Sequence, residues 1–297
     1  MNRGDYYGRE TIILANEFFQ LECLADGGPR IVRLVPEWLG ENILAEVPEA
    51  VTHTPHGDFH FIGGHRLWVS PESLEVTYIP DDQGVTAKRI ANGVKLEGGI
   101  QPDAHLRKSI TVQVSPDSPF VMLKHTIENL GRTATRLSPW ALTMLRTEST
   151  AILPQELGTV DKDGVLPNRT FSLWAYSRWD DPRLTLGDEF IKLKASSEDA
   201  RPFKLGYFNP HGWLGYVFED VFFLKRFSVR REETYPDYNC NAEVYTNDRF
   251  IELESLGPLV ELQPQEEVVL TETWEVYELD LIPPDLFGGK TLKQVLK

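Results

Sequence analysis

Short runs of alternating apolar and polar residues, each closed by a turn, recur along most of this chain and constrain its fold more than any other feature. Clear examples are residues 85–90, 93–100, 105–114 and 120–128, with an Asn-Gly pair between the first two runs and a Ser-Pro-Asp-Ser-Pro segment between the last two. Alternation with a period of two is typical of strands with one buried face, and Asn-Gly pairs are typical of hairpins. Because a dozen or more such runs occur, the sequence predicts an all-β sandwich or barrel rather than alternating strands and helices.

Two of the best-patterned runs, Phe250–Leu256 and Glu267–Tyr277, lie near the C-terminus and are separated by turns that contain glycine and proline. We expect them to form a hairpin in a large sheet. Since side chains alternate across a strand, Glu252 and Glu254 should point to the same side. This shared face is either a solvated outer surface or part of a functional site.

Composition and charge limit the classes of partner. The chain has 297 residues, 41% of them hydrophobic, which is enough for a sizeable core. Its net charge of −15 disfavours binding to nucleic acid or to an anionic membrane. No apolar run reaches the roughly 20 residues that cross a bilayer, and no secretory signal pattern begins the chain. We therefore expect a cytoplasmic protein in which Cys23 and Cys240 are free buried thiols, although a disulfide between them stays open.

Residues 51–72 are rich in His, Gly, Pro and aromatic residues, and we expect them to form a long functional loop. Its glycine pair allows close approach to a ligand, and His65, Arg66 and Trp68 follow directly. They supply a proton carrier, a planar fork of donors and a flat apolar plate, which suit the hydroxyls and the C–H face of a sugar. The alternative is a structural loop in which Trp68 packs and Arg66 pairs with Glu72.

Four histidines and one aspartate crowd the same segment, so a metal-dependent β-sandwich or cupin-like enzyme is a further hypothesis. Their spacing matches neither H-x-H nor H-E-x-x-H. We therefore assign no metal ligand and expect no cofactor. The residues are His53, His56, Asp58, His60 and His65.

Several short motifs resemble the galactose mutarotase (aldose 1-epimerase) family. Residues 252–256, 262–266 and 271–277 read E-L-E-S-L, L-Q-P-Q-E and T-E-T-W-E-V-Y, which is similar to the end of that family, except that Gln265 stands where the family has glycine. The glycine pair resembles the site entrance of sugar-phosphate mutarotases, and I-E-N-L-G at 127–131 resembles the segment that precedes the family's histidine-bearing strand.

The resemblance implies a fold and a division of the chain. We expect a large antiparallel β-sandwich, the supersandwich of galactose mutarotase type, over residues 1–280. A short tail, helical in our expectation, follows over residues 281–297.

The resemblance also implies roles for individual residues. It makes Glu254 the base at the anomeric hydroxyl and Arg66 a substrate contact. The family's acid histidine is absent, because Trp140 lies in the segment where it would stand. Ring opening also needs an acid at the ring oxygen, and His65 is our first candidate and His211 the second.

The sequence thus predicts a protein that binds a small-molecule carbohydrate and resembles aldose 1-epimerase. It would interconvert the anomers of an aldose or a sugar phosphate without a cofactor. A non-catalytic carbohydrate-binding protein is the alternative, and the oligomeric state stays open. The substrate-binding residues that we expect are Arg66, Trp68, Trp140, His211, Lys225 and Glu243.

Overall fold

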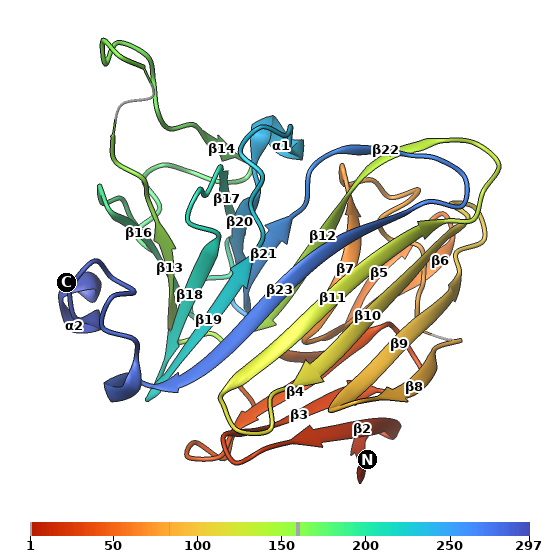
Figure 1. Ribbon diagram of the computed structural model, residues 1–297. Helices are drawn as coiled ribbons and strands as arrows, with labels where there is room; N and C mark the ends of the chain where they lie inside the picture. Colours follow the sequence, from red (N-terminus) through yellow and green to blue (C-terminus); the bar gives the residue numbers. More distant parts are fainter. Residues whose placement is uncertain (1, 83, 159–160) are drawn as a thin grey trace.

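A computed structural model describes residues 2–82, 84–158 and 161–297. Two large antiparallel sheets and a separate hairpin account for its strands (Figure 1). This architecture confirms the predicted all-β sandwich.

The first sheet follows the order β1-β2-β3-β4-β7-β12-β21-β20-β17-β14, and β22 pairs with β12 outside this path. Its strands are β1 (Asn2–Tyr6), β2 (Arg9–Ala15), β3 (Phe19–Leu24), β4 (Arg30–Pro36), β7 (His65–Ser70), β12 (Thr135–Leu145), β14 (Phe171–Leu173), β17 (Phe203–Tyr207), β20 (Ala242–Thr246), β21 (Ile251–Leu256) and β22 (Val260–Leu262).

The second sheet follows the order β15-β16-β13-β18-β19-β23-β11-β10-β9-β8. Its strands are β8 (Thr86–Ile90), β9 (Gly93–Ile100), β10 (Leu106–Val114), β11 (Phe120–Asn129), β13 (Ser149–Pro154), β15 (Leu184–Thr185), β16 (Phe190–Ala195), β18 (Trp213–Phe218), β19 (Val221–Phe227) and β23 (Glu267–Glu278).

The main core lies between these sheets, and burial along each strand shows which faces it covers. In β11, every second residue is buried and the others are wholly or partly exposed, so one face packs inward and one meets water. In contrast, β7 and β21 are buried along their whole length. These central strands of the first sheet are therefore covered on both faces. Inward-facing core residues include Ile110, Leu123, Leu205, Phe223, Leu253 and Trp274.

The predicted C-terminal hairpin is wrong, because β21 and β23 belong to different sheets. The chain leaves β21 at Gly257, pairs briefly with β12 as β22, and only then enters β23 in the facing sheet. Gln265 lies in the connection with a φ of 69°, a conformation that favours glycine. This agrees with the family's glycine at the same place in the motif.

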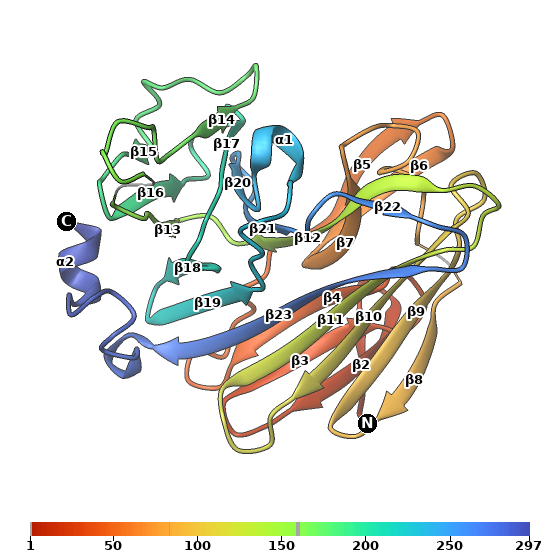
Figure 2. The ribbon, with the colours of Figure 1, turned by 45° about the horizontal axis from the view of Figure 1, so that its top comes forward.

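The predicted loop over residues 51–72 is also wrong. The hairpin of β5 (Glu46–Thr54) and β6 (Gly57–Gly63) is followed by β7, and Figure 2 shows the hairpin beside β7. A strand that is buried on both faces shows no alternation in its sequence, which is why β7 resembled irregular chain. Gly63 and Gly64 allow the turn between β6 and β7, with φ values of 112° and 69°.

Helical structure is confined to short segments in the part of the chain that the structure describes. They are α1 (Pro236–Asn239), the 3-10 turn Leu279–Leu281 and α2 (Leu292–Leu296), which begins with a capping box between Thr291 and Gln294. None of these helices has the length and apolar character that a membrane crossing requires. Cys23 and Cys240 are free and buried.

Candidate functional site

A cavity with a polar and aromatic lining lies over β7, β12 and β21, on the face of the first sheet that points away from the second sheet. The β5–β6 hairpin lies to one side of these strands, and β14, β17 and β20 lie to the other (Figure 2). The cavity between them, which we call the groove, has a volume of about 480 Å³. Its lining includes Phe61, Arg66, Trp68, Tyr78, Trp140, Tyr176, Lys204, Tyr245 and Glu252.

Alternation along paired strands brings these side chains together. In the ladder between β7, β12 and β21, Arg66 pairs with Leu142, and Leu142 pairs with Glu254. Trp68 pairs with Trp140 in the same way. The even-numbered residues of all three strands therefore share the groove face.

Arg66 anchors one end of the groove. Its Nη2 donates to Glu252 Oε1 over 2.9 Å, and its guanidinium lies 4.0 Å from the ring centre of Trp68. Arg66 Nε and Nη1, and Trp68 Nε1, are buried and have no hydrogen-bond partner among the described residues. Burial of unpaired donors is costly, so this end of the groove has unused capacity to bind acceptor oxygens.

Glu252 and Glu72 both line the groove, and Glu252 is the one that pairs with Arg66. Burial raises its pKa, the neighbouring Glu254 raises it further, and Arg66 opposes both effects. A carboxyl group with a raised pKa is better suited to exchange protons near neutral pH than an ordinary surface glutamate.

Glu254 shares the groove face but lies beneath other side chains. Its Oε2 accepts hydrogen bonds from Trp140 Nε1 at 2.8 Å and Lys204 Nζ at 2.9 Å. Lys204 Nζ also lies 2.7 Å from Glu243 Oε2. Burial raises the pKa of Glu243. Burial alone would lower the pKa of Lys204, but the negative charges of Glu243 and Glu254 outweigh it and raise that pKa. One cation thus holds two buried carboxyl groups under the floor of the groove.

Aromatic rings form much of the groove wall. The ring centre of Trp68 lies 4.7 Å from that of Tyr78 and 5.4 Å from that of Trp140. Tyr78 donates to Glu72, so the alternative pairing of Arg66 with Glu72 is not what forms. Flat apolar surfaces beside buried charged groups are the usual composition of a small-molecule site.

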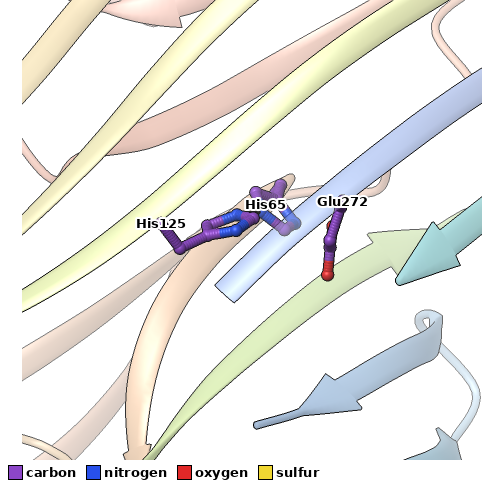
Figure 3. A group of neighbouring side chains, drawn as sticks. All are labelled: His65, His125 and Glu272. Atoms are coloured by element: carbon purple, nitrogen blue, oxygen red, sulfur yellow. Dashed lines mark hydrogen bonds between the residues drawn. The ribbon is translucent and has the colours of Figure 1, made fainter. Parts of the chain in front are cut away.

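The structure corrects the expectation that His65 and Glu254 face the same ligand. His65 is the odd-numbered neighbour of Arg66 in β7, so its fully buried ring points between the two sheets. His65 Nε2 lies 2.7 Å from Nε2 of His125 on β11 (Figure 3). It therefore cannot deliver a proton to a sugar that contacts the groove face.

The partners of this histidine pair assign its tautomers. His125 Nδ1 donates to the carbonyl of Leu270 over 3.1 Å, so its Nε2 accepts from His65. His65 Nδ1 then accepts from the hydroxyl of Thr143 at 2.9 Å. Burial lowers the pKa of both histidines, which keeps them neutral.

Lys225 belongs to the same hydrogen-bond network as the two histidines. The sequence predicts that it binds substrate, but its side chain lies between the sheets and does not line the groove. Its Nζ donates to Thr143 Oγ1 and to two main-chain carbonyls, and it lies 3.1 Å from Glu272 Oε1. Glu272 also accepts from Ser255 Oγ and from Trp274 Nε1. We call this set the inter-sheet network, and every polar side-chain atom in it has a partner. Its members are His65, His125, Thr143, Lys225, Ser255, Glu272 and Trp274.

A metal ion is the other conceivable occupant of the inter-sheet network. Ligand atoms of His65, His125 and Glu272 all lie within 4.8 Å of one another (Figure 3). However, the two imidazole Nε2 atoms already bond to each other, and the ammonium of Lys225 already neutralises Glu272. The arrangement therefore fits a closed hydrogen-bond network better than a metal centre.

The remaining predicted residues lie elsewhere. His211 is exposed and its Nε2 lies 3.3 Å from the carbonyl of Gln155, outside the groove lining, which corrects its expected role. The crowded histidines of residues 53–60 separate as well, since His53 pairs with Asp58 and His56 with Asp103. Sequence reasoning missed Lys204, Tyr78 and Tyr176 as site residues. It placed Glu252 beside Glu254 without recognising that Glu252 is the more accessible of the two.

Comparison with models of known protein families gives no match for this sequence, and comparison with curated proteins gives none either. Solved structures are more informative. A TPR-domain containing protein from Parabacteroides distasonis ATCC 8503 superposes with a TM-score of 0.61 at 13% identity, covering 97% of this chain and 51% of that one. This chain therefore spans about half of that protein.

Two further structures match along nearly their full length. A galactose mutarotase-like protein from Lactobacillus casei ATCC 334 gives a TM-score of 0.58 at 12% identity, covering 90% of this chain and 100% of that one. A protein from Escherichia coli K12, provisionally described as an aldose 1-epimerase, gives 0.52 at 11% identity, covering 91% and 99%. At such identities the likeness establishes architecture alone. This chain therefore has the galactose mutarotase-like β-sandwich fold.

Proposed function

We propose that this protein binds a monosaccharide in the groove over β7, β12 and β21. The observation that carries the proposal is the combination, in one cavity of about 480 Å³, of aromatic walls with an arginine two of whose buried nitrogens have no hydrogen-bond partner among the described residues. The volume lies within the range of about 300–1,000 Å³ that is typical of small-molecule sites.

Each part of the groove has a role toward a sugar. The rings of Trp68, Trp140 and Tyr78 offer apolar surface to the C–H face. Arg66 Nε and Nη1 and Trp68 Nε1 would donate to hydroxyl or ring oxygens. The carboxylate of Glu252 would accept from a hydroxyl, because an ionised carboxylate only accepts.

The likeness to galactose mutarotase-like structures supports the same kind of ligand. The expected contacts of Arg66, Trp68 and Trp140 are retained in this proposal. Glu243 and Glu254 become supporting residues, which hold Lys204 and Trp140 in place from below the groove.

Isothermal titration calorimetry with a panel of aldoses tests the binding proposal. We expect saturable heat for at least one sugar, and a loss of affinity of about tenfold or more when Trp140→Phe removes ring surface and the bond to Glu254. Trp179→Phe is the matched control, since that ring is 54% exposed and outside the groove. Absence of heat with every aldose up to about 100 mM, a concentration far above an ordinary Kd, contradicts the proposal.

Interconversion of anomers is a second candidate function, and one observation favours it. Glu252 lines the groove and burial raises its pKa, so it is placed to take the anomeric hydroxyl proton. As this proton leaves, the bond from the anomeric carbon to the ring oxygen breaks, and Arg66, which contacts Glu252, would stabilise the negative charge that develops on the ring oxygen. Solvent water would protonate that oxygen, and reclosure on the other face of the carbonyl reverses both proton transfers. Here Glu252 replaces Glu254 as the proposed base.

Polarimetry of freshly dissolved α-anomer distinguishes these two functions. If the protein is an epimerase, it accelerates mutarotation, and Glu252→Gln slows it by about 10²-fold or more, the usual contribution of a proton-transferring group. Glu261→Gln, at an exposed position of β22, should leave the rate unchanged. Sugar binding without acceleration leaves the protein as a non-catalytic carbohydrate binder.

A further inference from the structure

A second cavity lies at one end of the sandwich and shares no lining residue with the groove. Its volume is about 90 Å³. It lies where β9 bulges opposite β10, between the pairings of Arg107 with Ile100 and Ser109 with Glu97. Its lining residues are Gly28, Pro29, Pro80, Asp81, Gly98, Gly99, Ile100, Gln101, Pro102 and Lys108.

Two polar side chains of this cavity have no partner among the described residues. Lys108 is 3% exposed and its Nζ makes no hydrogen bond there. Gln101 is 6% exposed, and both its Oε1 and its Nε2 are unpartnered. An unpaired ammonium and an unpaired amide in one buried space are costly unless something else binds them.

The charges around the cavity do not balance. Asp81 is the carboxylate that lines the cavity, and Arg30 Nη2 donates to its Oδ1 over 2.8 Å. Arg30 therefore neutralises the negative charge of Asp81. Arg66, whose charge also acts on Lys108, is paired with Glu252. Lys108 therefore remains as an excess positive charge, and burial lowers its pKa to about 8.

Size limits what could bind there. A water molecule occupies about 30 Å³ of liquid, so a cavity of about 90 Å³ holds roughly three waters or one anion of about four heavy atoms. A monosaccharide or a nucleotide is too large. The mouth is accessible beside Ile100, which is 55% exposed.

We propose that this cavity binds a small monovalent oxyanion that carries one hydroxyl hydrogen, of which bicarbonate is the simplest. Its oxygens accept from Lys108 Nζ and Gln101 Nε2, and its hydroxyl donates to Gln101 Oε1. One such ion satisfies all three unpartnered atoms and neutralises the excess charge. A halide offers no hydroxyl to the amide oxygen, and formate offers none either.

Thermal unfolding of the full chain at constant pH and constant sodium concentration tests the proposal. Replacing chloride by bicarbonate in a closed vessel should raise the Tm of the wild-type protein by about 2 °C or more. Formate should raise it less. Lys108→Met should abolish the rise, and the variant should fold because it removes a buried cation that has no partner among the described residues. The matched control Lys95→Met, on neighbouring β9 with a half-exposed side chain, should respond as the wild type does.

Calorimetric titration of bicarbonate into the wild-type protein and into Gln101→Leu gives a second, independent readout. We expect affinity to fall about tenfold or more in the variant, so this arm still tests the site if Lys108→Met fails to fold. A wild-type Tm that does not respond, an equal rise in Lys108→Met, or equal stabilisation by chloride overturns the proposal.

Discussion

The groove and the inter-sheet network lie on opposite faces of the same three strands, and both contain buried charges. In the groove, Arg66 and Trp68 have N–H groups without a partner among the described residues, and beneath it one oxygen of Glu254 also has none there. In the inter-sheet network, Lys225, Glu272 and both histidines have all their polar atoms paired within the described chain. A buried network in which every polar atom is hydrogen-bonded stabilises a fold. Buried polar atoms that lack a hydrogen-bond partner are instead typical of a ligand-binding site. The predictions that follow test this contrast, from the largest expected effect to the smallest.

The largest effect is expected from breaking the closed network. Lys225→Met leaves the carboxylate of Glu272 buried without its cation, and loss of one partner of a buried pair typically costs about 3–5 kcal/mol. Urea unfolding measures this cost as a change in the free energy of unfolding. The matched control is Lys124→Met, whose exposed pairing with Glu267 at 3.9 Å should contribute less than about 1 kcal/mol. Equal costs for the two variants would show that the inter-sheet network is not structurally important.

The second effect is the response of stability to pH. Burial lowers the pKa of His65 and His125 in the native protein, so both stay neutral while the unfolded chain takes up protons below about pH 6.5. Their contribution to stability is therefore complete above about pH 6.5 and is lost as the pH falls, by at most about 1.4 kcal/mol per pH unit for each histidine. Unfolding free energies between pH 7.5 and pH 5 provide the measurement.

Two variants separate the contribution of the histidines to this pH dependence from the contribution of the carboxylates. His125→Asn keeps a donor toward Leu270 and removes one titrating ring, so it should flatten the slope. His53→Asn, at an exposed ring, should leave the slope as it is. An unchanged slope in His125→Asn contradicts the assignment of a neutral buried pair.

The third effect belongs to the groove and should appear in binding rather than stability. Arg66→Lys keeps a positive charge near Glu252 but removes the planar fork, so we expect sugar affinity to fall about tenfold or more, or about 1.4 kcal/mol. Calorimetric titration with the best-bound sugar measures this loss. Arg226→Lys, beside Glu275 on the second sheet, is the control and should bind as the wild type does. An Arg66→Lys variant with full affinity would remove the arginine from the proposed contacts.

The smallest effect is expected at the indole of Trp68. Trp68→Phe removes one donor and keeps a flat ring, so the affinity should fall by about 0.5–1.5 kcal/mol, the net value of one hydrogen bond. Because that donor has no partner in the described chain, the unliganded variant should lose no hydrogen bond, and any loss of stability should come from the smaller ring in the buried aromatic cluster. A sugar affinity equal to that of the wild type would mean that the indole N–H does not contact the sugar.

The contrast between the two faces also explains how far the sequence could be interpreted. Alternation correctly put Glu252 and Glu254 on one face, because it depends only on local geometry. The same rule separates His65 from Arg66, but it holds only within a strand, and the composition of residues 51–72 predicts a loop. Glu272 carried a usable signal, because it is a carboxylate in the middle of the apolar face of its strand.

Other features depend on contacts that are distant in the sequence. The assignment of β21 and β23 to different sheets follows from strand pairing with β12 and β11, which no local pattern specifies. Lys204 reaches Glu254 only because β17, β20 and β21 are consecutive in one sheet. The all-β class could therefore be predicted from the sequence, while the pairing of charges in the site could not.

The most direct test of the contrast is a sugar titration followed by the indole N–H resonances of a ¹⁵N-labelled protein. Trp68 represents the groove, where its Nε1 has no partner among the described residues, and Trp274 represents the inter-sheet network, where Nε1 donates to Glu272 at 3.0 Å. We predict that the Trp68 resonance shifts as the groove fills and that the Trp274 resonance stays in place. Shifts of equal size at both indoles, or no shift at Trp68 with any aldose, would contradict the account.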